Sequence, residues 1–118
     1  MILVDTSVWI DHLTRKDDKL TILLNSSKVC IHPFIIGELA CGNISNRTEI
    51  LVLLKALPRI EPAFEEEVFT LIERKKLFGI GLGLIDVHLI ASALIHNVKI
   101  WTRDKSLLRI VTNLNINK

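Results

Sequence analysis

The sequence is poor in the residue types that build several common kinds of site. It has no tyrosine, and aromatic residues make up only 5% of its 118 positions. A row of aromatic side chains that stacks several bases is therefore not expected, and Trp9 and Trp101 stand in core-like positions. The two cysteines, Cys30 and Cys41, lack C-x-x-C spacing. We expect them to be buried free thiols, with no disulfide.

Long apolar runs and targeting features are also missing. No run approaches the roughly 18 residues of a membrane helix, and the start, Met1–Asp5, has neither a basic region nor a cleavage site. We therefore expect a cytoplasmic protein that does not enter the membrane. With 118 residues and 49% hydrophobic content, the chain is long enough to form one domain, residues 1–118, around its own core. The high apolar content also suits a surface that meets a partner.

Short apolar segments alternate with amphipathic ones along the chain. Strands are expected at Ile2–Val4, Lys28–His32 and Lys99–Thr102. Helices are expected at Thr6–Leu13, Asp17–Leu24, Pro33–Gly42, Asn46–Leu57, Ala63–Phe78, Asp86–Asn97 and Asp104–Val111. In the helix that begins near Ala63, Phe64, Val68, Leu71 and Ile72 form the apolar stripe. This alternation predicts an α/β fold with a mainly parallel sheet covered by helices on both faces.

Two further patterns are weaker indications of function. Gly79, Gly81 and Gly83 follow a helix and lack the G-x-G-x-x-G spacing, which indicates a flexible connector and not a phosphate loop. His88 and His96 share a helical stripe with Ser92. The two histidines are about two turns apart, too far to chelate one metal ion, so this stripe is expected to face solvent or a partner.

The acidic residues carry the strongest signal. Asp5, Asp86 and Asp104 each follow a hydrophobic segment, and Glu38 is the only charged residue between Pro33 and Gly42. Burying a lone carboxylate is costly unless a cation neutralises it. Four acids beside apolar segments therefore suggest one shared hard divalent metal ion with oxygen ligands.

The expected topology brings these acids to one edge. Ligands bind beyond the carboxyl ends of parallel strands, and Asp5 ends the first strand. A helix of about 11 residues from Asp86 spans about 16 Å, and a strand of about five residues returns about the same distance to Asp104. An alternative role remains for the aspartates, because each precedes a helix and could cap it, a contribution of about 1 kcal/mol. Glu38 lies within a helix, so capping does not explain it.

Charge and hydroxyl groups add to this picture. The net charge is +2, but if four acids bind metal, the other nine face 15 Lys and Arg, leaving about +6 for the rest of the molecule. This balance suits a polyanionic substrate, and it equally suits an ordinary solvated basic surface. Arg103 and Lys105 are candidate phosphate contacts, and the hydroxyls of Thr6, Ser7 and Thr102 can orient a carboxylate or a water.

Four blocks of the sequence resemble those of PIN-domain proteins. They are Asp5-Thr6-Ser7-Val8-Trp9-Ile10-Asp11, Gly37-Glu38-Leu39, Gly83-Leu84-Ile85-Asp86-Val87-His88-Leu89-Ile90-Ala91-Ser92-Ala93 and Trp101-Thr102-Arg103-Asp104. More narrowly, the chain resembles a VapC-type toxin of a type II toxin–antitoxin pair. The blocks occur in the family's order over nearly the whole chain, although Leu107 stands where some members carry another acid.

The resemblance has specific implications. It implies a PIN-like three-layer α/β/α sandwich with a sheet of four to five strands. It implies a Mg²⁺- or Mn²⁺-dependent endoribonuclease that forms a dimer and is inhibited by a VapB-like antitoxin. One or two ions suit this chemistry, and because no platform for stacking several bases is visible, we expect the substrate to be a structured loop of tRNA or rRNA. The implied metal and catalytic residues are Asp5, Glu38, Asp86 and Asp104, with Thr6 and Thr102 as accessory residues.

Other classes fit less well. A phosphatase of the haloacid-dehalogenase type needs a second aspartate two residues after the first, where this chain has Ser7. A receiver domain needs an acidic pair beside Asp5, which is missing. The remaining alternative is a catalytically inactive PIN-like module that binds RNA or protein, and the retention of all four acids argues against it.

Overall fold

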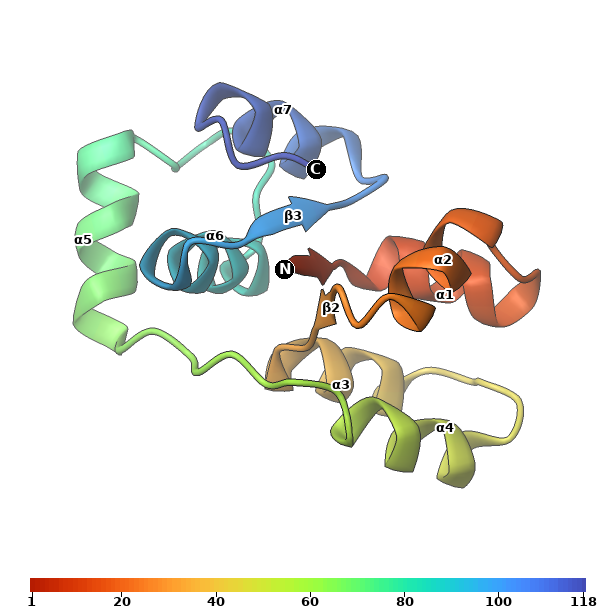
Figure 1. Ribbon diagram of the computed structural model, residues 1–118. Helices are drawn as coiled ribbons and strands as arrows, with labels where there is room; N and C mark the ends of the chain where they lie inside the picture. The colour runs from red at the N-terminus through yellow and green to blue at the C-terminus, as the bar shows by residue number, and fades with distance from the viewer.

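Three short parallel strands form the centre of the molecule. The computed structural model describes all residues, 1–118, and Figure 1 shows their arrangement. The strands are β1 (Ile2–Val4), β2 (Val29–Cys30) and β3 (Lys99–Trp101), in the order β2-β1-β3. The helices are α1 (Thr6–Thr14), α2 (Asp18–Asn25), α3 (Pro33–Cys41), α4 (Arg47–Lys55), α5 (Glu65–Lys75), α6 (Leu84–His96) and α7 (Lys105–Asn113). The expected α/β class with a parallel sheet is confirmed.

The sheet has three strands, where four to five were expected. Two further segments lie alongside it, and each pairs through one parallel bridge, Ile31 with Arg59 and Ile100 with Asn117. Pro58 precedes Arg59 and has no N–H group, so it cannot donate to a longer ladder. The additional extended segments are therefore present but too short to count as strands.

The central strand sets the position of the residues that follow it. β1 pairs with both neighbours, and Val4 lies opposite Trp101 of β3. Leu3 and Val4 are both fully buried, as expected for a strand of a parallel sheet that is covered on two faces. The N–H of Asp5 donates to the carbonyl of Trp101 at 2.9 Å. The residues after β1 and β3 are thus held side by side.

The helices divide the molecule into two ends. In Figure 1, α1 and α2 lie at the end toward which β1 and β3 point, whereas α5 stands at the opposite end, packed on α6. α3 and α4 lie beside β2, and α7 lies beside β3. None of the helices combines the length and hydrophobicity needed to cross a membrane.

The α5 helix is shorter than the sequence pattern predicts. It covers Glu65–Lys75, and Phe64, which was expected in its buried stripe, is the N-cap residue with 79% of its surface exposed. At its other end Lys76 has a φ of 53° and ends the helix in the left-handed region. Val68 is buried as expected. The prediction for Phe64 was wrong because the chain before the helix is extended, so a 3.6-residue period does not apply there.

Two other burial predictions were wrong. Cys41, expected to be buried, is exposed at the end of α3, while Cys30 in β2 is buried as expected. The stripe of α6 that contains Ser92 faces the protein, since Ser92 is fully buried and its Oγ accepts from the N–H of Ala63 at 3.2 Å. His88 on this stripe is half-buried and only His96 is exposed. A segment far away in the sequence covers this face, and no local pattern shows that.

Candidate active site

Asp5 is the most firmly positioned of the four acids. It is buried, with 6% of its surface exposed, and it follows β1 as the N-cap residue of α1. Its side chain makes no cap hydrogen bond. Instead, Oδ2 accepts from Ser7 Oγ and from Thr102 Oγ1, both at 2.8 Å. The carboxylate is therefore held by hydroxyl donors, and capping is not its role.

The two hydroxyls also join Asp5 to the chain after β3. Thr102 is buried, and its Oγ1 accepts from the N–H of Asp104 at 3.0 Å. Ser7 Oγ accepts from the N–H of Arg103 at 3.0 Å. Ser7 and Thr102 thus play equivalent roles: each hydroxyl donates to Asp5 and accepts from a backbone N–H of the chain after β3. We expected from the sequence that the hydroxyls of Ser7 and Thr102 can orient a carboxylate, and the structure shows that both donate to Asp5.

Glu38 is oriented in the same way from another helix. It is half-buried on α3, and its Oε1 accepts from Thr6 Oγ1 at 2.7 Å. Thr6 is the first residue of α1, so this hydrogen bond links the element after β1 to the element after β2. The accessory position predicted for Thr6 is consistent with this contact.

Asp86 lies in the first turn of α6 and is half-buried. Its Oδ2 accepts from the N–H of Gly83 at 3.1 Å, which satisfies one of the free donors at the start of this helix. α6 therefore begins at Leu84, two residues before the predicted start. Burial raises the pKa of Asp86 despite this hydrogen bond, and the negative charges of Asp5 and Asp104 raise it further.

Asp104 differs from the other three acids. It is exposed and is the N-cap residue of α7, where its Oδ1 accepts from the N–H of Leu107 at 3.0 Å. Asp104 therefore caps the start of α7, as the alternative reading of the aspartates allowed. Its charge still acts on Asp86, so it lies near the same group of carboxylates.

Arg103 is not a free phosphate contact in this structure. Its guanidinium binds Asp11 at 2.7 Å and Asp17 at 2.5 Å. These hydrogen bonds raise the pKa of Arg103, and the bond from Arg103 lowers the pKa of Asp17. The three residues connect α1 and the start of α2 to the chain after β3. The sequence did not indicate the partners, because 92 and 86 positions separate them from Arg103. Lys105 is exposed and forms no ion pair.

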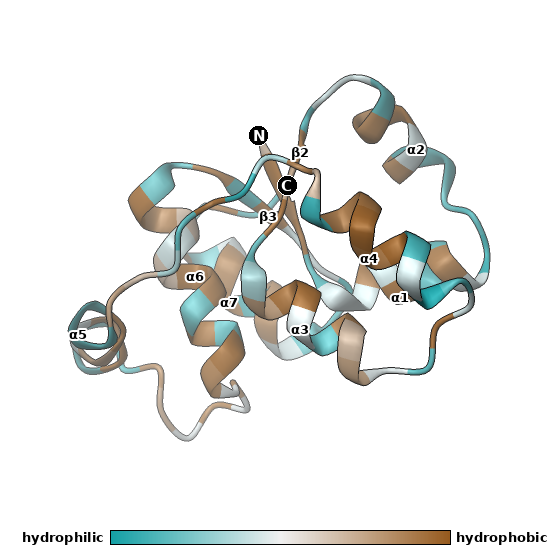
Figure 2. Cartoon of the chain, turned by 90° about the horizontal axis from the view of Figure 1, so that it is seen from below, coloured by the Kyte–Doolittle hydropathy of each residue, from teal (hydrophilic) through white to brown (hydrophobic).

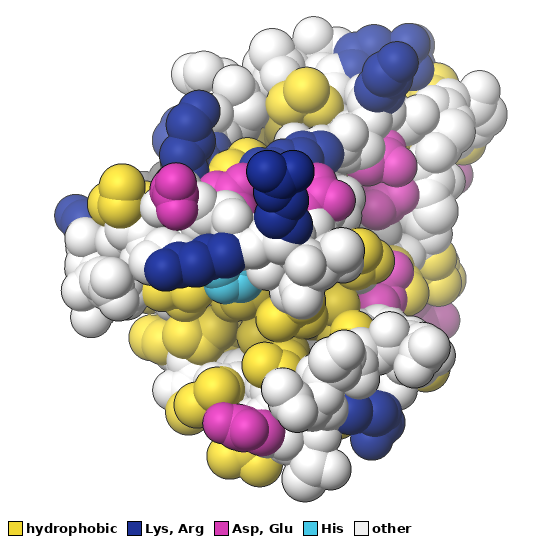
Figure 3. All heavy atoms as spheres, turned by 90° about the vertical axis from the view of Figure 1, so that its right-hand side faces the viewer, with side chains coloured by type: hydrophobic (Ala, Val, Ile, Leu, Met, Phe, Trp, Pro, Cys, Tyr) yellow, Lys and Arg dark blue, Asp and Glu magenta, His cyan; other side chains and the backbone are white.

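The four acids have no cationic partner within the chain. None of them is in an ion pair, because the acidic partners in the salt bridges are Asp11, Asp17 and Glu61. Figure 3 views the end toward which the strands point, and acidic side chains gather across the middle of this face with Lys and Arg among them. No three histidine, cysteine or acidic side chains are close enough to form a complete metal-binding cluster.

This donor set nevertheless suits Mg²⁺ or Mn²⁺. Mg²⁺ prefers carboxylate oxygens and keeps several of its waters, so it needs only one or two direct protein ligands. Burial and, to a smaller extent, repulsion by Asp5 and Asp104 raise the pKa of Asp86, and a divalent cation beside the carboxylate would offset both. The residues present therefore fit a hard divalent metal ion.

Comparisons with known proteins identify the family of the chain. The family described as PIN domain matches residues 2–112. Ribonuclease VapC32 from Mycobacterium tuberculosis, in strains CDC 1551 / Oshkosh and ATCC 25618 / H37Rv, is 45% identical over 108 residues, which cover 91% of this chain and 87% of the relative.

Proposed function

The chain belongs to the PIN-domain family, and from this premise we propose that it is a metal-dependent endoribonuclease, the toxin of a VapBC-like toxin–antitoxin pair. The single observation that carries the catalytic part is the set of carboxylates without cationic partners, of which Asp5 after β1 and Glu38 on α3 are held by hydroxyl donors. The similarity to a ribonuclease over most of both chains supports the substrate class.

We assign the metal site to Asp5, Glu38, Asp86 and Asp104. When bound, one or two divalent ions make water nucleophilic near neutral pH and neutralise the charge that develops on the phosphate. Asp5 and Asp86 would be the principal ligands, since they are the least exposed of the aspartates in this group. Glu38 would hold a second ion or orient the attacking water, and Asp104 would contribute directly or through water.

The chain's own contribution is to hold these oxygens in place before substrate arrives. Ser7 and Thr102 fix one oxygen of Asp5, and Thr6 fixes one oxygen of Glu38. Such prior orientation reduces the reorganisation needed in the transition state. Lys105 stands beside Asp104 without an acidic partner and is the better candidate for a phosphate contact than Arg103.

A VapB-like antitoxin needs an apolar surface, and the structure offers one. A groove of about 340 Å³ between α1, α2 and α4 is lined by Trp9, His12, Leu13, Leu24, Ile50, Leu53, Leu54 and Leu57. Figure 2 shows hydrophobic residues along α4 beside α1, and Val52 and Leu53 are 64% and 57% exposed. We assign the antitoxin segment to this groove, in the manner of an amphipathic helix that buries its apolar face. We also propose that the toxin forms a homodimer.

Removal of divalent metal is expected to abolish RNA cleavage by the purified toxin. The test compares cleavage of total tRNA and rRNA in EDTA, in Mg²⁺ and in Mn²⁺, and then maps the cut sites. Activity that persists at the same rate in EDTA would contradict the metal-dependent mechanism. A folded protein that binds the metal and RNA but cuts nothing would support the inactive binding module instead.

Cleavage is expected to depend on the shape of an RNA loop more than on a long base sequence. The chain has no tyrosine and few aromatic residues with which to stack several bases, so phosphate contacts should dominate binding. The measurement presents one mapped target as its folded RNA and as an unstructured oligonucleotide with the same local bases, at matched salt. Equal rates for the two would show that base sequence carries the selectivity.

A further inference from the structure

A groove with an almost uncharged lining runs along α3, next to the candidate active site. It has a volume of about 650 Å³. Ile85 of α6 lines one side, and α3 lines the other from its first residue to its last, through Pro33, Phe34, Gly37, Glu38 and Cys41. This volume lies within the range of about 300–1,000 Å³ that is typical of ligand sites.

The groove continues into the candidate metal site. Glu38 belongs to both, and Ile85 directly precedes Asp86. Phe34, Glu38 and Cys41 are spaced by four and three residues, so they lie along one face of α3. A phosphate held by a metal ion at Glu38 and Asp86 would therefore have the groove beside it.

The lining favours an uncharged group as the occupant. Glu38 is the only charged residue in it, and no Lys or Arg takes part. A phosphate in the groove would meet no cation, whereas a phosphate at the metal site would meet the bound ion. The part of an RNA strand that is uncharged and reaches sideways from the phosphate is the base.

Phe34 offers an aromatic surface that its neighbours hold in place. Its side chain is 36% exposed, and its ring centroid lies 5.0 Å from that of His32 and 4.7 Å from that of His88, both in edge-to-face contact. His32 is fully buried and His88 is half-buried, so the two supporting rings are themselves packed. Stacking on such a ring suits any base, because every base has a π face.

Gly37 leaves space in the same groove. It is exposed in the middle of α3, and a Cβ built on it would meet no other atom within 4 Å. Glycine weakens a helix interior relative to other residues, so its presence does not serve the helix. The bare backbone between Phe34 and Glu38 instead allows a flat ring to lie close to α3.

We propose that this groove binds one base of the RNA, that of the nucleotide adjoining the phosphate that is cut, against Phe34 and over Gly37. The inference rests on the proposed ribonuclease function and adds a base-binding site to it. A base inside a duplex is stacked and paired, whereas a base in a loop can be splayed out and enter a pocket. One such site therefore favours loops without a row of aromatic side chains.

Gly37→Leu tests the groove by filling it. The value of kcat/KM on the mapped target is expected to fall about tenfold or more, while the urea midpoint rises because leucine is a better helix former than glycine. Gly37→Ala is the matched control, since it also strengthens the helix but leaves most of the groove open. Its cleavage is expected to stay within about threefold of wild type, and calorimetric Mn²⁺ binding should be unchanged in both variants.

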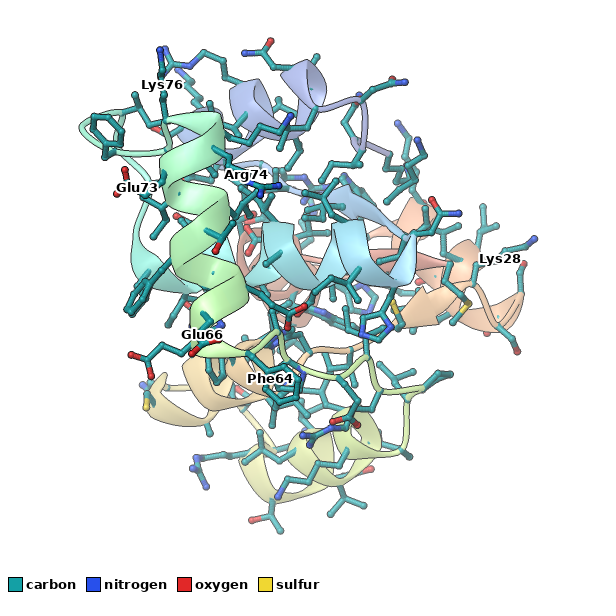
Figure 4. All side chains as sticks on the ribbon, turned by 90° about the vertical axis from the view of Figure 1, so that its left-hand side faces the viewer. Lys28, Phe64, Glu66, Glu73, Arg74 and Lys76 are labelled. Carbon is teal, nitrogen blue, oxygen red and sulfur yellow. The ribbon has the colours of Figure 1, made fainter.

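Phe34→Leu tests the stacking surface. It is expected to lower kcat/KM about tenfold. The matched control is Phe69→Leu, which changes a phenylalanine that is 52% exposed and does not line the groove. Phe69 belongs to α5, which lies at the front of Figure 4, on the side of the molecule opposite to that seen in Figure 3. Circular dichroism checks that each variant is folded.

Abasic substrates identify the base itself. The mapped target is made with a nucleotide that lacks its base on one side of the cut, and then on the other side. One of these two RNAs is expected to lose as much kcat/KM with the wild type as Phe34→Leu loses on the intact target. The same RNA should cause little further loss with Phe34→Leu or Gly37→Leu, because the contact is already absent.

Cys41 reports occupancy of the groove without cleavage. It is exposed and lines the groove, whereas Cys30 is buried, so a maleimide reagent reacts first with Cys41. A short single-stranded RNA in Mg²⁺, in excess over the protein, is expected to slow this reaction several-fold. An abasic oligonucleotide of the same length should slow it little. Without RNA, the rate should not depend on protein concentration.

The outcomes decide for or against the base site. Cleavage by Gly37→Leu as fast as by Gly37→Ala overturns it, and so does cleavage of both abasic RNAs at the rate of the intact target. Equal protection of Cys41 by the abasic strand would mean that the backbone covers the groove, and slower labelling at high protein concentration would mean that a second copy does; either result overturns it. If no RNA is cut, protection by RNA but not by the abasic strand still supports the base site, and the failure counts only against the proposed catalytic function.

Discussion

Replacing Asp86 with asparagine is expected to reduce metal-dependent RNA cleavage about 10³-fold, and Asp5→Asn should have a comparable effect. Each change keeps the shape of the side chain but removes a negative charge from the proposed metal site. Glu38→Gln should give a similar loss. Initial rates on a mapped RNA target, at saturating Mg²⁺ and again at Mn²⁺, provide the measurement.

The same Asp86→Asn variant is expected to be more stable than the wild type without metal at neutral pH. Burial raises the pKa of Asp86 above its unfolded value, so the folded chain loses stability as the pH rises through that interval and the carboxyl ionises. The uncharged amide avoids this penalty. Urea unfolding in EDTA at pH 7 gives the comparison.

The control for both measurements is Glu73→Gln, an equivalent loss of charge at an exposed position of α5, far from the site. It should leave both cleavage and stability close to wild type. Wild-type cleavage by a folded Asp86→Asn protein would remove Asp86 from the metal site. Reduced cleavage together with reduced stability would indicate a structural role only.

Acidification from pH 7 toward 4 is expected to remove about 3 kcal/mol of stability through His32 alone. His32 is fully buried as the N-cap residue of α3, and its Nδ1 accepts from the N–H of Phe34 at 3.0 Å. Burial lowers the pKa of His32 from 6.5 to about 4, and the positive charges of His88, Arg59 and His96 contribute. Since the unfolded chain takes up the proton first, stability falls below pH 6.5 and levels off below about 4.

His32→Asn isolates this effect. The amide oxygen of asparagine can accept the same N–H bond at the start of α3, but it does not titrate. The variant is expected to be less stable at pH 7, because its side chain is smaller, and to lose about 3 kcal/mol less than the wild type between pH 7 and 4. Urea midpoints at half-unit pH steps show the difference. Identical pH profiles would mean that other groups cause the acid sensitivity.

The candidate residues of the site could be proposed from the sequence because short-range rules govern them. Asp5 and Asp104 each come after a parallel strand, and the chain leaves these strands at one edge, whereas Asp86 lies in the first turn of α6. Glu38 was recognisable because a charged residue in an apolar helix needs a special environment. The α/β class followed from the same alternation of segments.

Contacts between distant segments explain what the sequence did not show. Ser7 and Thr102 meet on Asp5 across 95 positions, and Arg103 pairs with Asp11 and Asp17 where a free phosphate contact was expected. The burial of Ser92 and the exposure of Phe64 likewise depend on which segment packs against which. A hydrogen bond within one element follows from local spacing, whereas a bond between elements exists only after the chain has folded. The sequence therefore determined which acidic groups are the candidates for the chemistry, and the tertiary structure determined which neighbours orient, bind or cover them.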